Sequence, residues 1–66
     1  MTYDTLTKMC VNKFKEYDVA TCNRALVDCH ATLRAQGEDI APDYARKLWA
    51  EIDALRSRVA MLQRKA

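Results

Sequence analysis

Three cysteines and a single histidine are the residues of this 66-residue chain best suited to bind a metal or to form a disulfide. Cys22 and Cys29 stand seven residues apart in one helical pattern, about 10.5 Å along a helix axis. That separation is too long for one zinc ion, and no Cys-x-x-Cys pair is present. An odd cysteine count, with Cys10 as the third, is typical of reduced thiols, and His30 borders an apolar stripe as a packing residue would. The sequence therefore predicts no metal, no cofactor and no disulfide.

Residues for catalysis are equally sparse. The chain has one serine, Ser57, placed in the middle of a helical pattern, and it has no glycine-rich loop that could hold a phosphate. Glu51 and Asp53 point about 160° apart on a helical wheel, so they do not form an acid–base pair. We therefore expect that the protein is not an enzyme.

Basic side chains gather at the C-terminal end, where residues 56–66 carry four bases and no acid, although the formal net charge is only +2. Candidate contacts to an anion are Arg56, Arg58, Arg64 and Lys65. They point in several directions on a helical wheel. The expected third helix also starts among Glu38, Asp39 and Asp43, the wrong charge for a recognition helix approaching DNA. A nucleic-acid-associated accessory protein remains an alternative, with binding that weakens steeply with salt.

The elements that must position these residues are helices. Half of the residues are apolar and 30% are charged, and there is one glycine and one proline, a composition typical of an all-α fold. Apolar residues recur at spacings of three and four, which predicts helices at about 4–17, 19–36 and 42–64 within one domain, residues 1–66. We expect a compact three-helix bundle, a helical hairpin plus a shorter N-terminal helix. Its expected core is Leu6, Cys10, Phe14, Val19, Cys22, Leu26, Cys29, Leu33, Leu48, Trp49, Ile52, Leu55 and Val59.

The third helix carries an unbroken apolar seam formed by Ala45, Leu48, Ile52, Leu55, Val59 and Leu62. Read as heptads, it has Ile52 and Val59 at a positions and leucines at d positions, which favours a parallel two-stranded coiled coil. The seam therefore serves either self-association or packing against the other two helices of the same chain. Its length, under three heptads, and the neighbouring Trp49 favour packing within the bundle.

The opposite side of that helix carries small and apolar residues in place of the usual Glu and Lys. Ala50, Ala54, Ser57 and Met61 follow one another at offsets of four, three and four. They form either a second contact face for a partner or a solvated face rich in alanine, the best helix former.

Taken together, these features predict a small interaction protein that acts by binding and occupying a partner, of the regulator or inhibitor type that phages and plasmids encode. We expect it to be a homo-oligomer, since so short a chain has a marginal core. The alternative is an oligomer that sequesters a small anionic ligand such as a nucleotide, using bases from several copies: Lys8, Lys15, Arg24 and Arg34. The first six residues lack the blocks of a secretion signal, and no apolar run reaches about 20 residues, so we expect a cytoplasmic location away from membranes.

Overall fold

The computed structural model describes residues 2–64, and these residues form an all-α fold of three helices joined by short turns. The elements are α1 (Tyr3–Lys13), α2 (Val19–Gln36), the 3-10 helix η1 (Gly37–Asp39) and α3 (Pro42–Arg64). The three-helix bundle expected from the sequence is thus confirmed, with a short N-terminal helix and a longer helical hairpin. No helix among the described residues is both long enough and apolar enough to cross a bilayer.

Local capping chemistry explains where the helices begin and end. The Thr2 hydroxyl and the Asp18 carboxylate accept the backbone N–H groups of Thr5 and Thr21, at 3.3 and 2.7 Å, and so cap α1 and α2. Gly37 ends α2 with φ of +56°, a conformation that residues with a Cβ rarely adopt. α3 starts at Pro42, where a missing N–H costs nothing. The bounds expected for the second and third helices are therefore confirmed.

The first helix is shorter than expected. The sequence predicted a helix over residues 4–17, whereas α1 ends at Lys13. Phe14 donates its N–H to the Cys10 carbonyl oxygen, and the chain then turns with Tyr17 N–H bonded to the Phe14 carbonyl oxygen. The Phe14 and Tyr17 rings meet edge to face at 4.9 Å, so the apolar spacing that suggested a longer helix instead packs a turn.

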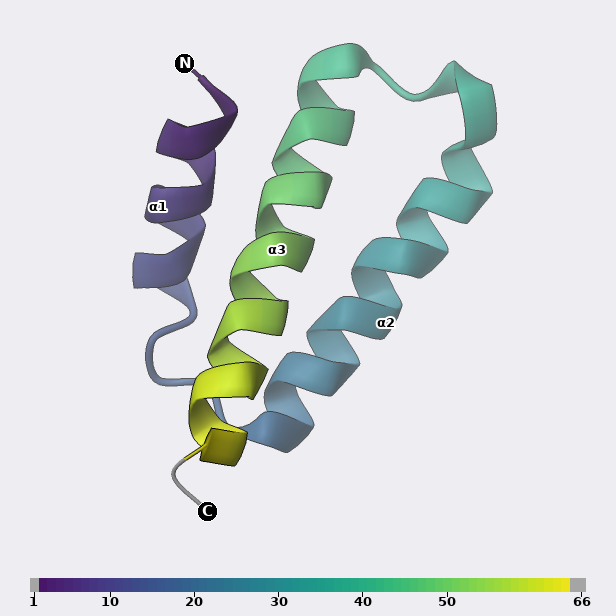
Figure 1. Ribbon diagram of the computed structural model, residues 1–66. Helices are drawn as coiled ribbons and strands as arrows, with labels where there is room; N and C mark the ends of the chain where they lie inside the picture. Colours follow the sequence, from purple (N-terminus) through teal and green to yellow (C-terminus); the bar gives the residue numbers. More distant parts are fainter. Residues whose placement is uncertain (1, 65–66) are drawn as a thin grey trace.

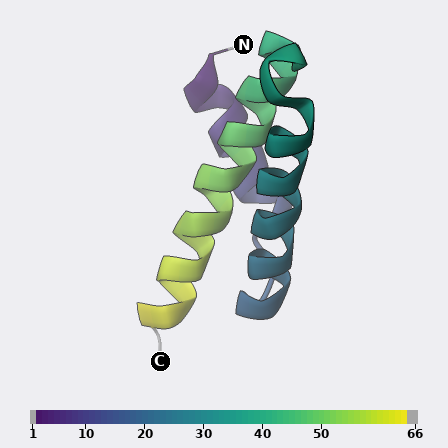
Figure 2. The same cartoon turned by 90° about the vertical axis from the view of Figure 1, so that its right-hand side faces the viewer.

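α3 is the middle helix of the bundle. α1 packs on one side of it and α2 on the other, while no Cα atom of α1 comes within 8 Å of one in α2 (Figure 1). α1 runs in the same direction as α3, and α2 runs opposite to both. The Cα extents of 40 × 24 × 14 Å agree, because 24 Å is about the width of three helices placed in a row. In the second view the last turns of α3 lean away from the start of α2 (Figure 2).

The core lies along both sides of α3. Seven of the expected core residues are buried: Cys10, Phe14, Cys22, Cys29, Leu48, Ile52 and Leu55. Five more are half-buried: Leu6, Val19, Leu26, Leu33 and Val59. The expectation was wrong for Trp49, whose side chain is 44% exposed. Because α1 and α2 cover the other sides of α3, the side that carries Trp49 stays open.

The apolar seam of α3 lies largely inside the bundle. Leu48, Ile52 and Leu55 are buried in the core that α2 and α3 share, and Ala45, Val59 and Leu62 are half-buried. A second copy of the chain cannot reach the three buried residues. The buried half of the seam therefore packs within one chain, while Ala45, Val59 and Leu62 remain partly accessible.

Candidate functional site

The small-residue face of α3 is mostly covered. Ala50 and Ala54 are 0% and 1% exposed, because α1 packs on this side of α3. Both interpretations offered above, an open partner face and a solvated face, are therefore wrong for these two residues, whose lack of side-chain bulk lets α1 approach. Ser57 and Met61, farther along the same side, remain exposed beyond the end of α1.

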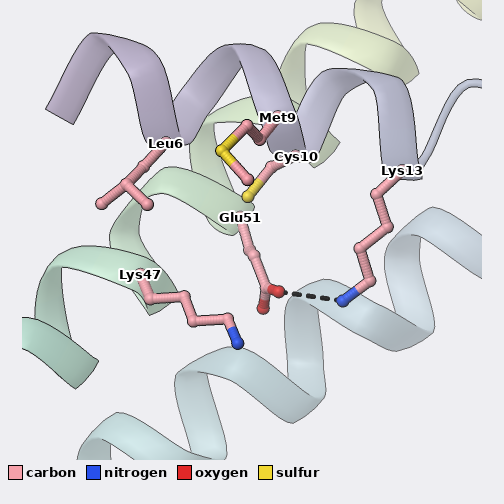
Figure 3. Close-up of a pocket in the computed structure, with 6 residues that line it drawn as sticks. All are labelled: Leu6, Met9, Cys10, Lys13, Lys47 and Glu51. Carbon is pink, nitrogen blue, oxygen red and sulfur yellow. Dashed lines mark hydrogen bonds and ion pairs between the residues drawn. The ribbon is translucent and has the colours of Figure 1, made fainter. Parts of the chain in front are cut away.

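Glu51 is the polar residue that joins all three helices. Its carboxylate, on α3, accepts a hydrogen bond from Lys13 Nζ of α1 at 3.1 Å and faces the Cys29 thiol of α2 at 3.8 Å. Lys13 and Lys47 both reach toward it across a pocket of about 300 Å³ that also has Cys10 on its wall (Figure 3). The bond from Lys13 to Glu51 raises the pKa of the lysine. Because Glu51 bonds to Lys13 of α1 and lies against Cys29 of α2, we interpret this cluster as structural.

The three thiols are buried and unable to pair with one another. Cys10 and Cys29 lie on α1 and α2, whose Cα atoms stay more than 8 Å apart, beyond the limit for a disulfide without backbone movement. Burial raises the pKa of all three thiols above the ordinary 9.0, and the nearby Glu51 carboxylate adds to this for Cys10 and Cys29. A neutral, buried thiol is a poor nucleophile. Within residues 2–64 no three His, Cys, Asp or Glu side chains are grouped so as to hold a metal ion.

These raised thiol pKa values predict that the protein loses stability in alkaline solution. The thiols ionise near pH 9 in the unfolded chain but only at higher pH in the folded protein. The stabilisation is therefore complete below about pH 9 and is lost as the pH rises through the folded pKa values. Urea unfolding between pH 7 and 10.5 should show a constant free energy up to about pH 8.5 and a fall above it. Cys22→Ala should flatten that fall, and equal stability at pH 8 and 10 would contradict the assignment.

The basic residues do not form one site. Arg58 donates from Nε to the Tyr17 carbonyl oxygen at 3.1 Å, which fixes the turn after α1 against α3. Arg56 and Arg64 are exposed, and Lys65 lies outside the described residues. The structure thus gives Arg58 a structural bond and does not bring the expected anion contacts together.

An open, partly apolar surface lies across α2 and α3, around Trp49. We call it the Trp49 face, and it consists of Tyr3, Val27, His30, Ala31, Arg34 and Trp49. On α2, a shallow hollow of about 360 Å³ is lined by Val27, His30, Ala31 and Arg34. The His30 ring meets the Trp49 indole of α3 edge to face at 6.4 Å, so the indole contacts one of the residues that line the hollow. Val27 is 65% exposed, the largest value among the exposed large apolar residues.

Tyr3 of α1 completes this face. Its hydroxyl donates a hydrogen bond to the Asp53 carboxylate and lies 3.2 Å from the backbone carbonyl oxygen of Trp49. The bond to Asp53 raises the pKa of the Tyr3 hydroxyl. Tyr3 therefore ties the start of α1 to α3 and leaves its ring, like the Trp49 indole, partly exposed. Aromatic groups from two helices thus border one surface.

The sequence analysis missed the Trp49 face because it placed Trp49 in the core and considered the exposed side of α2 only for charge. A signal was present. Val27, Ala31 and Arg34 follow at offsets of four and three on the side of α2 away from its apolar stripe, where a solvated helix normally carries charged residues.

Comparisons with protein-family models, with curated proteins and with solved structures find no significant match. The fold class, an all-α bundle of three helices, is therefore established by this structure alone, and the function must be argued from its surfaces.

Proposed function

We propose that this protein is a non-enzymatic interaction protein that binds and occupies a protein partner through the Trp49 face. The observation that carries the proposal is the half-exposed Trp49 indole against His30, which lines one hollow with Val27, a residue that is 65% exposed. Tryptophan and arginine are the residues most enriched among those that dominate binding energy at interfaces. Here Trp49 and Arg34 lie on one surface.

The arrangement of the helices supports the same proposal. With α1, α3 and α2 in a row, no further helix within residues 2–64 covers the side of α3 that carries Trp49. Contiguous exposed apolar surface in so small a domain is typical of a binding face. We extend the proposal to a regulatory or inhibitory role, in which the Trp49 face covers a surface of a larger partner.

We further propose that the protein works in a reducing compartment such as the cytoplasm. Its three thiols are free and buried. Cys10 on α1 is too far in the backbone from the two cysteines of α2 to form a disulfide with either of them. Such unpaired thiols are typical of proteins from reducing compartments.

Substitutions on the Trp49 face should abolish partner binding without unfolding the protein. Val27→Glu places a carboxylate in the apolar hollow, and Trp49→Ala removes the indole. The tagged protein is used to capture its partner from the source cells, and captured proteins are identified by mass spectrometry. Loss of the captured partner by at least about tenfold is expected for each variant, because central interface residues contribute about 2 kcal/mol or more.

Asn12→Glu is the matched control, since it adds the same carboxylate at an exposed position of α1. It should capture the partner as the unmodified protein does. All three variants should keep the helical circular dichroism spectrum. A partner that binds Val27→Glu and Trp49→Ala as well as the unmodified protein would show that another surface is used.

A further inference from the structure

A third and smaller hollow lies between α1 and α3, near the C-terminal end of α3. It has a volume of about 110 Å³ and is lined by Val11, Lys15, Ala54, Ser57, Arg58 and Met61. Its apolar walls are open to solvent, because Val11 is 45% and Met61 51% exposed, while Ala54 forms a buried floor. The hollow can therefore accept an apolar group from outside.

The surroundings of this hollow are basic. Lys15 and Arg58 line it, and residues 54–64 of α3 include three arginines and no acid. The hydrogen bond from Arg58 Nε to the Tyr17 carbonyl oxygen holds this guanidinium in place. An apolar hollow with fixed and mobile cations around it favours an apolar group that has carboxylates beside it.

The opposite end of the molecule offers that combination. Glu38 and Asp39 are exposed on η1, and residues 35–45 contain no Lys or Arg, while Asp43 at the start of α3 shares a hollow with Arg46 and Lys47. Tyr44, the next residue, is 42% exposed. This end and the C-terminal end of α3 lie at opposite ends of the bundle (Figure 1). One chain therefore carries both halves of a complementary pair that it cannot close on itself.

We propose that the hollow binds the acidic end of a second copy of this chain. The ring of Tyr44 packs on Val11 and Met61, and the carboxylates beside it face Lys15 and Arg58. Because the two surfaces differ, the contact runs head to tail and produces a closed ring or a short chain of copies. The Trp49 face takes no part in this contact, so the inference is independent of partner binding through that face.

The test uses two charge-reversed variants of the full chain. Lys15→Glu with Ser57→Glu makes the hollow acidic, and Glu38→Lys with Asp39→Lys makes the acidic end basic. Sedimentation velocity at about 50 mM salt should show that the unmodified protein self-associates and that added salt weakens this association. Each variant alone should associate at least about tenfold more weakly, as expected when a few charge pairs become repulsive.

An equimolar mixture of the two variants should recover the association. In an alternating assembly, the acidic hollow of one variant meets the basic end of the other, and the acidic end of the first meets the basic hollow of the second. Misfolded variants could not recover the association in this way. The matched control for the first variant, Asn23→Glu with Arg24→Glu, makes the same change in net charge on exposed positions of α2 and should associate normally.

Three results would overturn the proposal. The first is an unmodified protein that stays monomeric at low salt, and the second is a mixture that fails to recover. The third is a monomeric protein that binds an acidic foreign protein, with binding abolished in the Lys15→Glu, Ser57→Glu variant. That result would show that the hollow binds the foreign protein and not a second copy of this chain.

Discussion

Leu55→Ala is expected to lower the free energy of unfolding by about 2–5 kcal/mol, the range for removing a buried leucine from a core that cannot collapse around the cavity. Leu55 is 0% exposed and lies on α3, the helix on which both others pack. A domain of this length has a total stability of roughly 3–10 kcal/mol. The substitution therefore removes a large share of it, and we expect the melting temperature to fall by about 10 °C or more.

Circular dichroism during heating and in urea measures this change. Leu62→Ala is the control, because it makes the same substitution one heptad later on α3, at a half-exposed position. Its cost should be about 1 kcal/mol or less. Similar losses for both variants would contradict the placement of Leu55 in the core and of Leu62 at its margin.

Ala50→Leu should be the next most damaging substitution, with a cost of about 1–3 kcal/mol, the range for forcing extra methylene groups into a filled core. Ala50 is 0% exposed on the side of α3 that α1 covers. The added side chain must push α1 away from α3, and it should also disturb the Tyr3 contact beside Trp49.

The control is Ala60→Leu, the same substitution at an exposed position of α3. It should change the stability by no more than about 0.5 kcal/mol. If Ala50→Leu is as well tolerated as Ala60→Leu, α1 does not cover this side of α3, and the small-residue face would again be open to a partner.

Both ends of α2 and the start of α3 could be predicted because local chemistry sets them. Asp18, Gly37 and Pro42 act within one helical turn, so each signal is complete in the sequence. The end of α1 could not be predicted in this way. Phe14 and Tyr17 keep the apolar spacing of a helix, but they belong to a turn whose shape depends on packing against α3.

The open and covered sides of α3 depend on tertiary packing. The periodicity of α3 shows one apolar seam, which α2 covers, but it does not tell on which remaining side α1 packs. α1 packs over Ala50 and Ala54, where small side chains permit close approach, and so leaves the larger Trp49 exposed. From the sequence, Trp49 was expected in the core and Ala50 and Ala54 at the surface, which is the reverse of the observed burial. The Trp49 face could be recognised only once the position of α1 on α3 was known.

The most direct test of the proposed function uses Trp49 itself, which is the only tryptophan of the chain. Quenching of its fluorescence by iodide is measured in the isolated protein and again in the complex with the captured partner. The partner is labelled so that its own tryptophans do not fluoresce, and the signal then comes from Trp49 alone. We predict ready quenching in the isolated protein, since the indole is 44% exposed, and at least about fivefold weaker quenching in the complex. Equal quenching in the two states would contradict binding through the Trp49 face.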